Sequence, residues 1–141
     1  MILLNTNVVS EPLKLTCDAG VLTWIDAQTI ETLYLSAMSL AELRFGIAAL
    51  TPGKRRDALH TSLEQRILPL FVGRILAFDA AASEAYAVLR ARARAQGKAI
   101  APADGYIAAT ATSHGLIVAT RDTGPFEAAG LTVINPWNTQ H

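Results

Sequence analysis

Ile2-Leu3-Leu4-Asn5, at the start of the chain, is a short apolar run that ends in a polar residue, and runs of strand length recur along the chain. The further runs are Leu33–Leu35, Ile75–Phe78, Leu116–Ala119 and Leu131–Ile134. Longer segments with helical spacing of apolar residues separate them. Short apolar strands that alternate with helices are typical of a parallel sheet between two layers of helices. The sequence therefore predicts an α/β fold, with a central parallel β-sheet of about five strands and helices on both faces.

Helices are predicted from apolar spacing and from end signals. They are Gly20–Gln28, Ser39–Leu50, Lys54–Leu68, the Ala-rich run between Asp79 and Gly97, and a segment from Pro102 to about Ser113. Ser39-x-x-Glu42 has the capping-box pattern, Asp79 is expected to be an N-cap, and Pro102 suits a first helical turn. No repeat, low-complexity tract or linker interrupts this order, so we expect a single domain over residues 1–141.

Composition excludes several classes of protein. Hydrophobic residues make up 51% and charged residues 17% of the chain, so it can bury a sizeable core and is not disordered. Twelve Lys and Arg balance twelve Asp and Glu, so any contact with nucleic acid must come from local patches. The single Cys17 excludes an intramolecular disulfide and a Cys-based zinc site. With no signal peptide and no apolar run long enough for a membrane span, we expect a soluble, cytoplasmic protein without a membrane partner.

Four polar residues from remote parts of the chain are expected to meet at one edge of the sheet. Asn5 follows the first strand, Asp122 follows the strand that ends at Ala119, and Glu42 and Asp104 lie in the opening turns of two helices. Ligands of parallel sheets bind beyond the carboxyl ends of the strands. Clustered carboxylates repel one another unless a cation lies between them, and oxygen donors without Cys or His favour Mg²⁺ or Mn²⁺. The sequence thus predicts a metal site suited to phosphodiester hydrolysis.

Each of these residues also has a structural explanation that stays open. Glu42 suits a capping box, the helix dipole favours Asp104, Asp122 suits the start of a turn, and Asn5 suits the cap of a short helix. Their expected convergence favours the functional interpretation. A receiver-type phosphoacceptor domain also places carboxylates at strand ends. It requires paired acids and a Lys at places where this sequence lacks them.

Four blocks of the chain resemble, in the same order, the motifs of PIN-domain ribonucleases of the VapC toxins. The blocks are MILLNTNVVSE (1–11), SLAELR (39–44), ADGYIAATA (103–111) and ATRD (119–122). The likeness spans nearly the whole chain and is greatest for the FitB subgroup, which shares GRIL (73–76), TRDTG (120–124) and NPW (135–137). The resemblance implies a PIN domain and the toxin component of a type II toxin–antitoxin system. It also implies a Mg²⁺- or Mn²⁺-dependent endoribonuclease that acts on RNA.

The same resemblance implies the partners: a cognate VapB- or FitA-type antitoxin, operator DNA bound through the antitoxin, and a homodimer or a higher toxin–antitoxin assembly. It implies a catalytic and metal-binding set, which is Asn5, Glu42, Asp104 and Asp122. Apart from the resemblance, Thr6, Asn7 and Thr120 are our candidates for hydrogen bonds that support these side chains, with ordinary turn residues as the alternative.

Position 5 departs from the family pattern, because the family carries an Asp where this chain has Asn5. An amide brings no negative charge and presents one oxygen where a carboxylate has two, so metal affinity is expected to fall. Engineered inactivation and natural loss both remain open as origins of this residue. The alternative function is a non-catalytic binding module that acts with its antitoxin in an operator-DNA-bound repressor complex.

Basic residues gather in two places. Lys54, Arg55 and Arg56 begin a predicted helix, where the dipole disfavours cations, and they are our candidates for RNA contact. The second group is Arg90, Arg92 and Arg94 with Lys98. A solvated helix face is the alternative for both groups.

Overall fold

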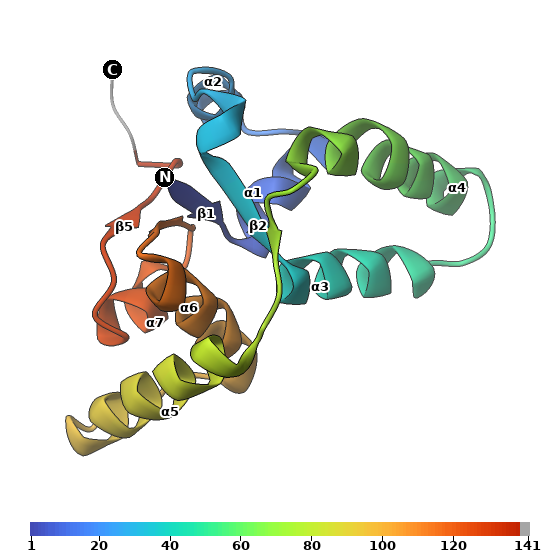
Figure 1. Cartoon of the computed structure of the whole chain (residues 1–141). Helices are drawn as coiled ribbons and strands as arrows, with labels where there is room; N and C mark the ends of the chain where they lie inside the picture. The colour runs from blue at the N-terminus through green and yellow to red at the C-terminus, as the bar shows by residue number, and fades with distance from the viewer. Residues whose placement is uncertain (139–141) are drawn as a thin grey trace.

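A parallel β-sheet lies at the centre of the computed structural model, which describes residues 1–138 (Figure 1). Its strands are β1 (Ile2–Leu4), β2 (Leu33–Ser36), β3 (Ile75–Leu76), β4 (Ile117–Ala119) and β5 (Val133–Ile134). They are arranged in the order β3-β2-β1-β4-β5, and every neighbouring pair is parallel. The predicted α/β class with a five-stranded parallel sheet is confirmed. Residues 139–141, the end of the predicted single domain, lie outside the described part.

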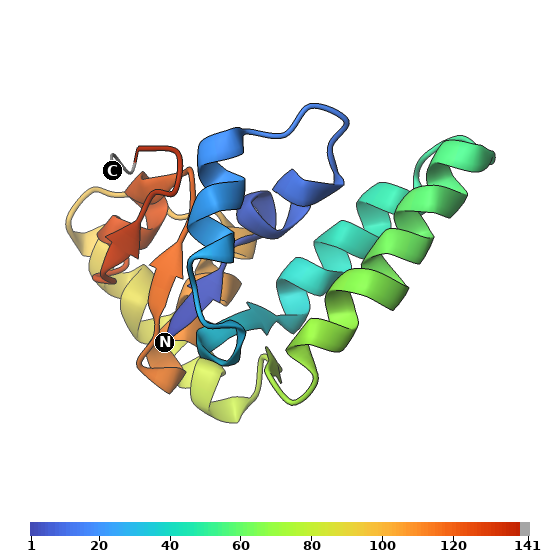
Figure 2. The same ribbon diagram turned by 90° about the horizontal axis from the view of Figure 1, so that it is seen from above.

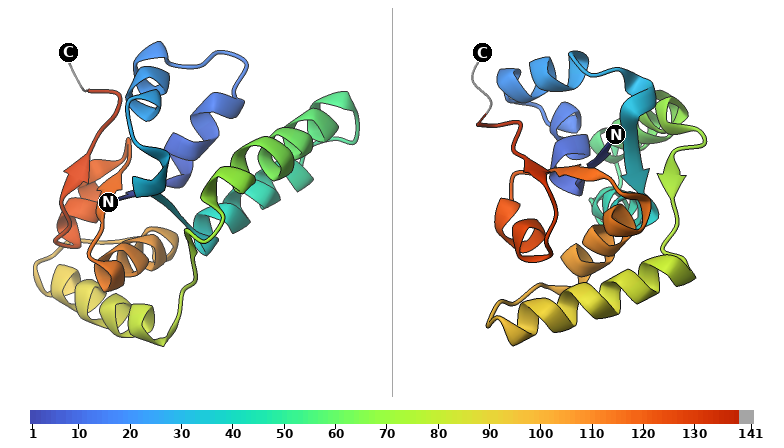
Figure 3. Two further views of the ribbon diagram at one scale, coloured as in Figure 1. Left: turned by 45° about the horizontal axis from the view of Figure 1, so that its top comes forward. Right: turned by 60° about the vertical axis from the view of Figure 1, so that its left-hand side comes forward.

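Helices cover both faces of this sheet (Figure 3). They are α1 (Thr6–Ser10), α2 (Ala19–Asp26), α3 (Ala37–Ala48), α4 (Lys54–Thr61), α5 (Ala80–Ala95), α6 (Pro102–His114) and α7 (Thr123–Ala128), with short turns η1 (Glu11–Leu13), η2 (Ile30–Thr32), η3 (Ser62–Ile67) and η4 (Leu68–Phe71). The elements α1–α4 pack on one face, and α5–α7 pack on the other. Within residues 1–138, none of these helices is long and apolar enough to cross a bilayer.

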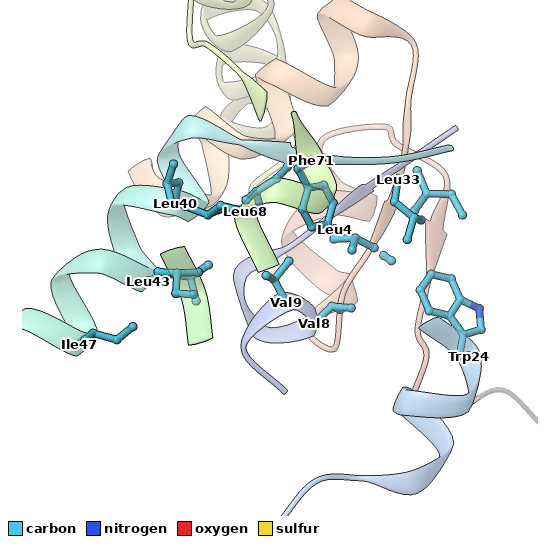
Figure 4. Close-up of a cluster of buried hydrophobic side chains, with 14 residues drawn as sticks. Leu4, Val8, Val9, Trp24, Leu33, Leu40, Leu43, Ile47, Leu68 and Phe71 are labelled. Carbon is cyan, nitrogen blue, oxygen red and sulfur yellow. The ribbon is translucent and has the colours of Figure 1, made fainter. Parts of the chain in front are cut away.

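Successive side chains of β1 contribute to the two halves of the core, one on each face of the sheet. Leu3 packs with the α5–α7 layer, whereas Ile2 and Leu4 pack with the α1–α4 layer, as side chains of a strand point to opposite faces. Figure 4 shows the buried cluster on the α1–α4 face, in which Leu4 lies near Val8 and Phe71. Full burial of one such side chain contributes about 1.5–3 kcal/mol. The central position of β1 follows from this two-sided burial.

Two of the predicted helix ends are confirmed, and one is wrong. Asp79 caps α5 by accepting a hydrogen bond from the Ala82 N–H at 2.9 Å. Pro102 occupies the first turn of α6. The predicted capping box does not form, because Ser36 is the N-cap of α3 and accepts from the Ser39 N–H at 3.0 Å. The chain passes from β2 directly into α3, so the helix begins one turn earlier than the pattern predicts.

The predicted helix Lys54–Leu68 is regular only as far as Thr61. It continues as the π-helical turn η3 and then as the 3₁₀ turn η4. Pro69 has no N–H, and a proline ring clashes with the carbonyl four residues earlier in an α-helix, so regular winding cannot pass this residue. Together, α3 and α4 with η3 form an arm that projects from the sheet (Figure 2).

Both edge strands are shorter than their apolar runs. β3 ends at Leu76, and Phe78 packs edge-on against the rings of Tyr86 and Tyr106 instead. β5 begins only at Val133, because the Leu131 N–H bonds to the Phe126 carbonyl at the end of α7. No helix is predicted from the sequence at α7, where the start of a turn at Asp122 was one open alternative.

The Asn135–Trp137 segment packs against the body of the protein. Pro136 is buried, and Trp137 contacts the cluster on the α1–α4 face. The Arg121 guanidinium lies 5.2 Å from the centre of the Trp137 ring. The segment therefore covers the end of β5 beside the β4–α7 junction.

Candidate functional site

Asn5 lies where the central strand ends. Its backbone N–H donates to the Ala119 carbonyl at 2.9 Å, so the carboxyl ends of β1 and β4 are joined. The residue is only 5% exposed. Its Oδ1 accepts from the Thr6 N–H at 2.9 Å, which caps α1, and its Nδ2 donates to Thr120 Oγ1 at 2.9 Å. The structural alternative for Asn5, the cap of a short helix, is thus present, and these two bonds determine the orientation of the amide.

The Thr120 hydroxyl connects the loops at this edge. Its oxygen also accepts from Asn7 Nδ2 at 3.4 Å and from the Asp122 N–H at 3.1 Å, and Thr120 is completely buried. Thr120 and Asn7 thus lie beside Asn5 and Asp122, where supporting residues were predicted. A single buried oxygen serves three donors from the β1–α1 and β4–α7 junctions.

A second hydrogen-bonded group positions Glu42 on α3. Thr6 Oγ1 donates to Glu42 Oε1 at 2.7 Å and lies 2.9 Å from Ser39 Oγ. Ser39 is fully buried, and sequence reasoning assigned it only a capping role. Residues three apart share a helix face, and this spacing was the available signal that Ser39 belongs with Glu42. Because the capping box does not form, the structural explanation for Glu42 is removed.

Three carboxylates from remote parts of the chain interact electrostatically. Burial, followed by the negative charges of Glu42 and Asp122, raises the pKa of Asp104 above its ordinary value. Within residues 1–138, the carboxylates of Asp104 and Asp122 accept no hydrogen bond and form no ion pair. Asp122 stands at the N-cap position of α7 without a side-chain cap bond, so helix capping does not account for it.

These donors suit a hard divalent cation, but they do not form a complete ligand set. In the described part of the chain, no three Asp, Glu, His or Cys side chains lie close enough together to hold a metal ion. All the available donors are oxygens, which Mg²⁺ and Mn²⁺ prefer. The single amide oxygen of Asn5 already accepts a hydrogen bond from the Thr6 N–H, and Asn5 Nδ2 is a hydrogen-bond donor that cannot bind a cation.

Of the three basic residues predicted to contact RNA, Arg55 comes nearest to the site. It lines a groove of about 340 Å³ that also contains Thr6 and Glu42 and runs between α1, α3 and α4. Other walls of this groove are apolar, from residues such as Leu43 and Leu59. Arg56 lines a separate hollow beside Arg44, and Lys54 lines neither. The position of the arm determines which of these basic residues lines the groove, and the sequence around them does not predict it.

Comparison with known proteins places this geometry in a family. Residues 2–131 match the PIN domain. The chain is 61% identical over 137 residues to VapC ribonuclease Y4jK from Sinorhizobium fredii, covering 97% of this chain and 98% of that protein. It is 56% identical over 138 residues to Toxin FitB from Neisseria gonorrhoeae, covering 98% and 99%. The crystal structure of FitAcB from Neisseria gonorrhoeae contains a chain that superposes with a TM-score of 0.96 at 55% identity, over 99% of this chain and 100% of that chain. The chain therefore belongs to the PIN-domain family, in the group that contains VapC ribonucleases and the toxin FitB.

Proposed function

We propose that the three carboxylates of Glu42, Asp104 and Asp122, which we call the acidic crevice, are the centre of a divalent-metal-dependent endoribonuclease and that Asn5 weakens this centre in this chain. The observation that carries the proposal is the convergence of Glu42, Asp104 and Asp122 from distant parts of the chain: hydrogen bonds of Thr6 and Thr120 tie Glu42 and the Asp122 backbone to the end of β1, and Glu42 and Asp122 both act on the pKa of Asp104. The names of the relatives, VapC ribonuclease and Toxin FitB, agree with this chemistry. On this proposal residues 1–141 form one PIN domain that acts in the cytoplasm as the toxin of a toxin–antitoxin system.

On this proposal Asp104, Glu42 and Asp122 would close around the cation from the wider spacing that they have here, and the second lone pair of the Asn5 oxygen would face it. When bound, Mg²⁺ or Mn²⁺ supplies positive charge that stabilises the negative charge developing on the phosphate oxygens. Thr6 orients the Glu42 carboxylate through its hydroxyl. Thr120 and Asn7 hold the β4–α7 junction that carries Asp122. These bonds preorganise donors whose mutual repulsion opposes closer approach in the absence of a cation.

Asn5 lowers the affinity for the cation in two ways. It removes one negative charge from the crevice, and it places the donor Nδ2 where a carboxylate has its second oxygen. A carboxylate at this position would accept from both the Thr6 N–H and the Thr120 hydroxyl, which can reverse its role from acceptor to donor. Asn5→Asp should therefore be accommodated without a change in the backbone.

The test is cleavage of a labelled transfer-RNA pool with Mn²⁺ by this chain, by Asn5→Asp, and by Asn5→Asp combined with Asp104→Asn. Gln65→Glu adds the same negative charge at an exposed position of η3 and is the matched control. Cleavage by Asn5→Asp alone, abolished by EDTA, is the expected result. Absence of both Mn²⁺ binding and cleavage in a folded Asn5→Asp variant would refute the proposed nuclease site.

The proposed protein partner is a small antitoxin that places an apolar segment in the groove lined by Leu43 and Leu59 and a basic side chain beside Glu42. The solved relative FitAcB supports a complex of this kind. Binding of a FitA-type antitoxin should weaken at least tenfold in Leu59→Asp, whereas exposed Gln65→Asp should leave it unchanged. Equal affinity of both variants would place the antitoxin elsewhere.

A second candidate function is a non-catalytic partner in an operator-DNA-bound repressor complex. It is favoured by Asn5 and by the structure of FitAB bound to an IR36 DNA fragment, in which a chain 53% identical to this one superposes with a TM-score of 0.96. On this proposal the toxin assembles as a homodimer or larger complex with its antitoxin. Light scattering of the purified complex and operator binding with and without this chain would test it.

A further inference from the structure

A basic groove lies along the C-terminal half of α5, apart from the acidic crevice. This hollow, of about 880 Å³, contains three cations and no carboxylate. We call it the α5 groove, and its lining is Arg90, Ala91, Arg94, Ala95, Lys98, Ala99 and Ile100. Arg90 and Arg94 are four residues apart and therefore lie on one face of the helix.

The cations of the α5 groove are not neutralised by acidic side chains. The ion pairs within residues 1–138 are Lys14–Glu11 and Arg44–Glu64, and both lie outside the groove. Arg90 donates to the Tyr86 hydroxyl at 2.7 Å, which is a neutral acceptor. Lys98 also borders a smaller hollow that contains Glu127. The excess of positive charge is therefore greatest at Arg90 and Arg94.

The inner end of this groove adjoins the first turn of α6, which carries Asp104. A Cβ atom added at Gly105 would lie 3.4 Å from the Arg90 Cδ atom and 3.0 Å from the Tyr86 ring. Ile100, at the other wall, is two residues before the start of α6. Figure 3 shows α6 packed against α5 on the side that faces the sheet. The positively charged side chains of the groove thus begin next to the first turn of α6, which carries the Asp104 carboxylate.

We propose that the α5 groove binds backbone phosphates of the RNA strand whose scissile bond enters the acidic crevice. This inference rests on the proposed nuclease function. A crevice of three carboxylates repels the phosphates on either side of the scissile bond, so substrate affinity must come from cations next to it. Arginine presents a planar fork of donors that matches phosphate oxygens. Arg90 and Arg94 are positioning residues in this arrangement.

The test compares Arg94→Ala with Arg92→Ala. Arg92 is exposed on the same helix, carries the same charge, and does not line the groove. The chain with Asn5 is used so that binding of a labelled transfer-RNA pool is followed without cleavage, over a range of salt concentrations. One lost phosphate contact lowers the slope of log K against log salt by about 0.7–0.9, which corresponds to about five- to eightfold weaker binding at 0.1 M salt.

We expect that loss for Arg94→Ala and a change of less than about twofold for Arg92→Ala, since Arg92 does not line the groove and salt weakens the long-range attraction of an exposed charge. In the Asn5→Asp background, Arg94→Ala should raise KM and leave kcat unchanged. Helicity measured by circular dichroism should remain the same in both variants, because alanine favours a helix.

Several results would overturn the inference. Equal weakening by the two variants would show a general charge effect, and no weakening by Arg94→Ala would remove the groove from the substrate path. If Arg94→Ala weakened only operator binding by the toxin–antitoxin complex, the groove would serve DNA. If Asn5→Asp cleaves RNA but Arg94→Ala changes neither RNA binding nor KM, the RNA-binding role of the α5 groove is rejected and the proposed nuclease function stands. Absence of any RNA binding and cleavage would reject the groove and the proposed function together.

Discussion

Thr120→Val removes one hydroxyl and keeps the branched shape of the side chain, and we expect it to lower the free energy of unfolding by about 2–3 kcal/mol. The loss comes mainly from Asn5, whose buried Nδ2 donates to Thr120 Oγ1 at 2.9 Å. A buried donor left without an acceptor costs about 1–3 kcal/mol. The N–H of exposed Asp122 adds about 0.5 kcal/mol, because water can replace the lost acceptor. The 3.4 Å bond from Asn7 is long and contributes little.

Urea unfolding followed by circular dichroism and tryptophan fluorescence measures this loss as a lower midpoint at unchanged slope. Thr120→Ser keeps the hydroxyl and is the control, with an expected cost of about 1 kcal/mol for one buried methyl group. In an Asn5→Ala background the buried donor is absent, so Thr120→Val should cost less than about 1 kcal/mol. An equal cost in both backgrounds would refute the reasoning, because Asn5 and Thr120 would then be energetically independent.

Asp104→Asn should raise the Tm of the metal-free protein at neutral pH. Burial and its acidic neighbours raise the pKa of Asp104 above its ordinary value of 3.8, so the native protein binds this proton more tightly than the unfolded chain and loses stability as pH rises through the native pKa. Calorimetry should therefore show the advantage of the variant shrinking as pH falls toward 3.8, and a constant advantage would contradict this origin. Asp79→Ala should cost about 1 kcal/mol in urea unfolding, because the Ala82 N–H loses its cap, and Asp79→Ser should restore most of it. Gly105→Ala should destabilise the protein by about 1–3 kcal/mol despite the helix propensity of alanine, because its Cβ would lie 3.0 Å from the Tyr86 ring. An unchanged midpoint for Gly105→Ala would show that the ring moves aside freely.

The strand ends could be predicted from the sequence because a parallel sheet aligns them. Asn5 and Thr120 each follow an apolar run, and pairing of β1 with β4 brings them within hydrogen-bond distance. The topology rule for parallel sheets needs only the order of the runs and not their packing. For this reason the edge of the sheet that carries the candidate site was predictable without coordinates.

Positions that depend on packing could not be predicted in the same way. Ser36 and Ser39 are both suitable caps, and the length of β2 decides between them. Arg55 reaches the groove beside Glu42 only because the loop of residues 49–53 turns the chain so that α4 runs back along α3. The spacing of apolar residues indicates which side of a helix is buried, but it does not indicate which other helix packs against that side.

The pairing of β1 with β4 also has a consequence during synthesis on the ribosome. Ile2 pairs with Ile117, so the first strand emerges long before its partner. At about 5–20 residues per second, the 115 residues from Leu3 to Ile117 take roughly 6–23 s to translate, whereas local hairpins form in microseconds. Until then Asn5 lacks its Thr120 acceptor, and Asp122 has not been added to the nascent chain. A prematurely terminated product therefore cannot assemble the crevice, and a nearby gene product translated in the same interval has time to fold before this one is complete.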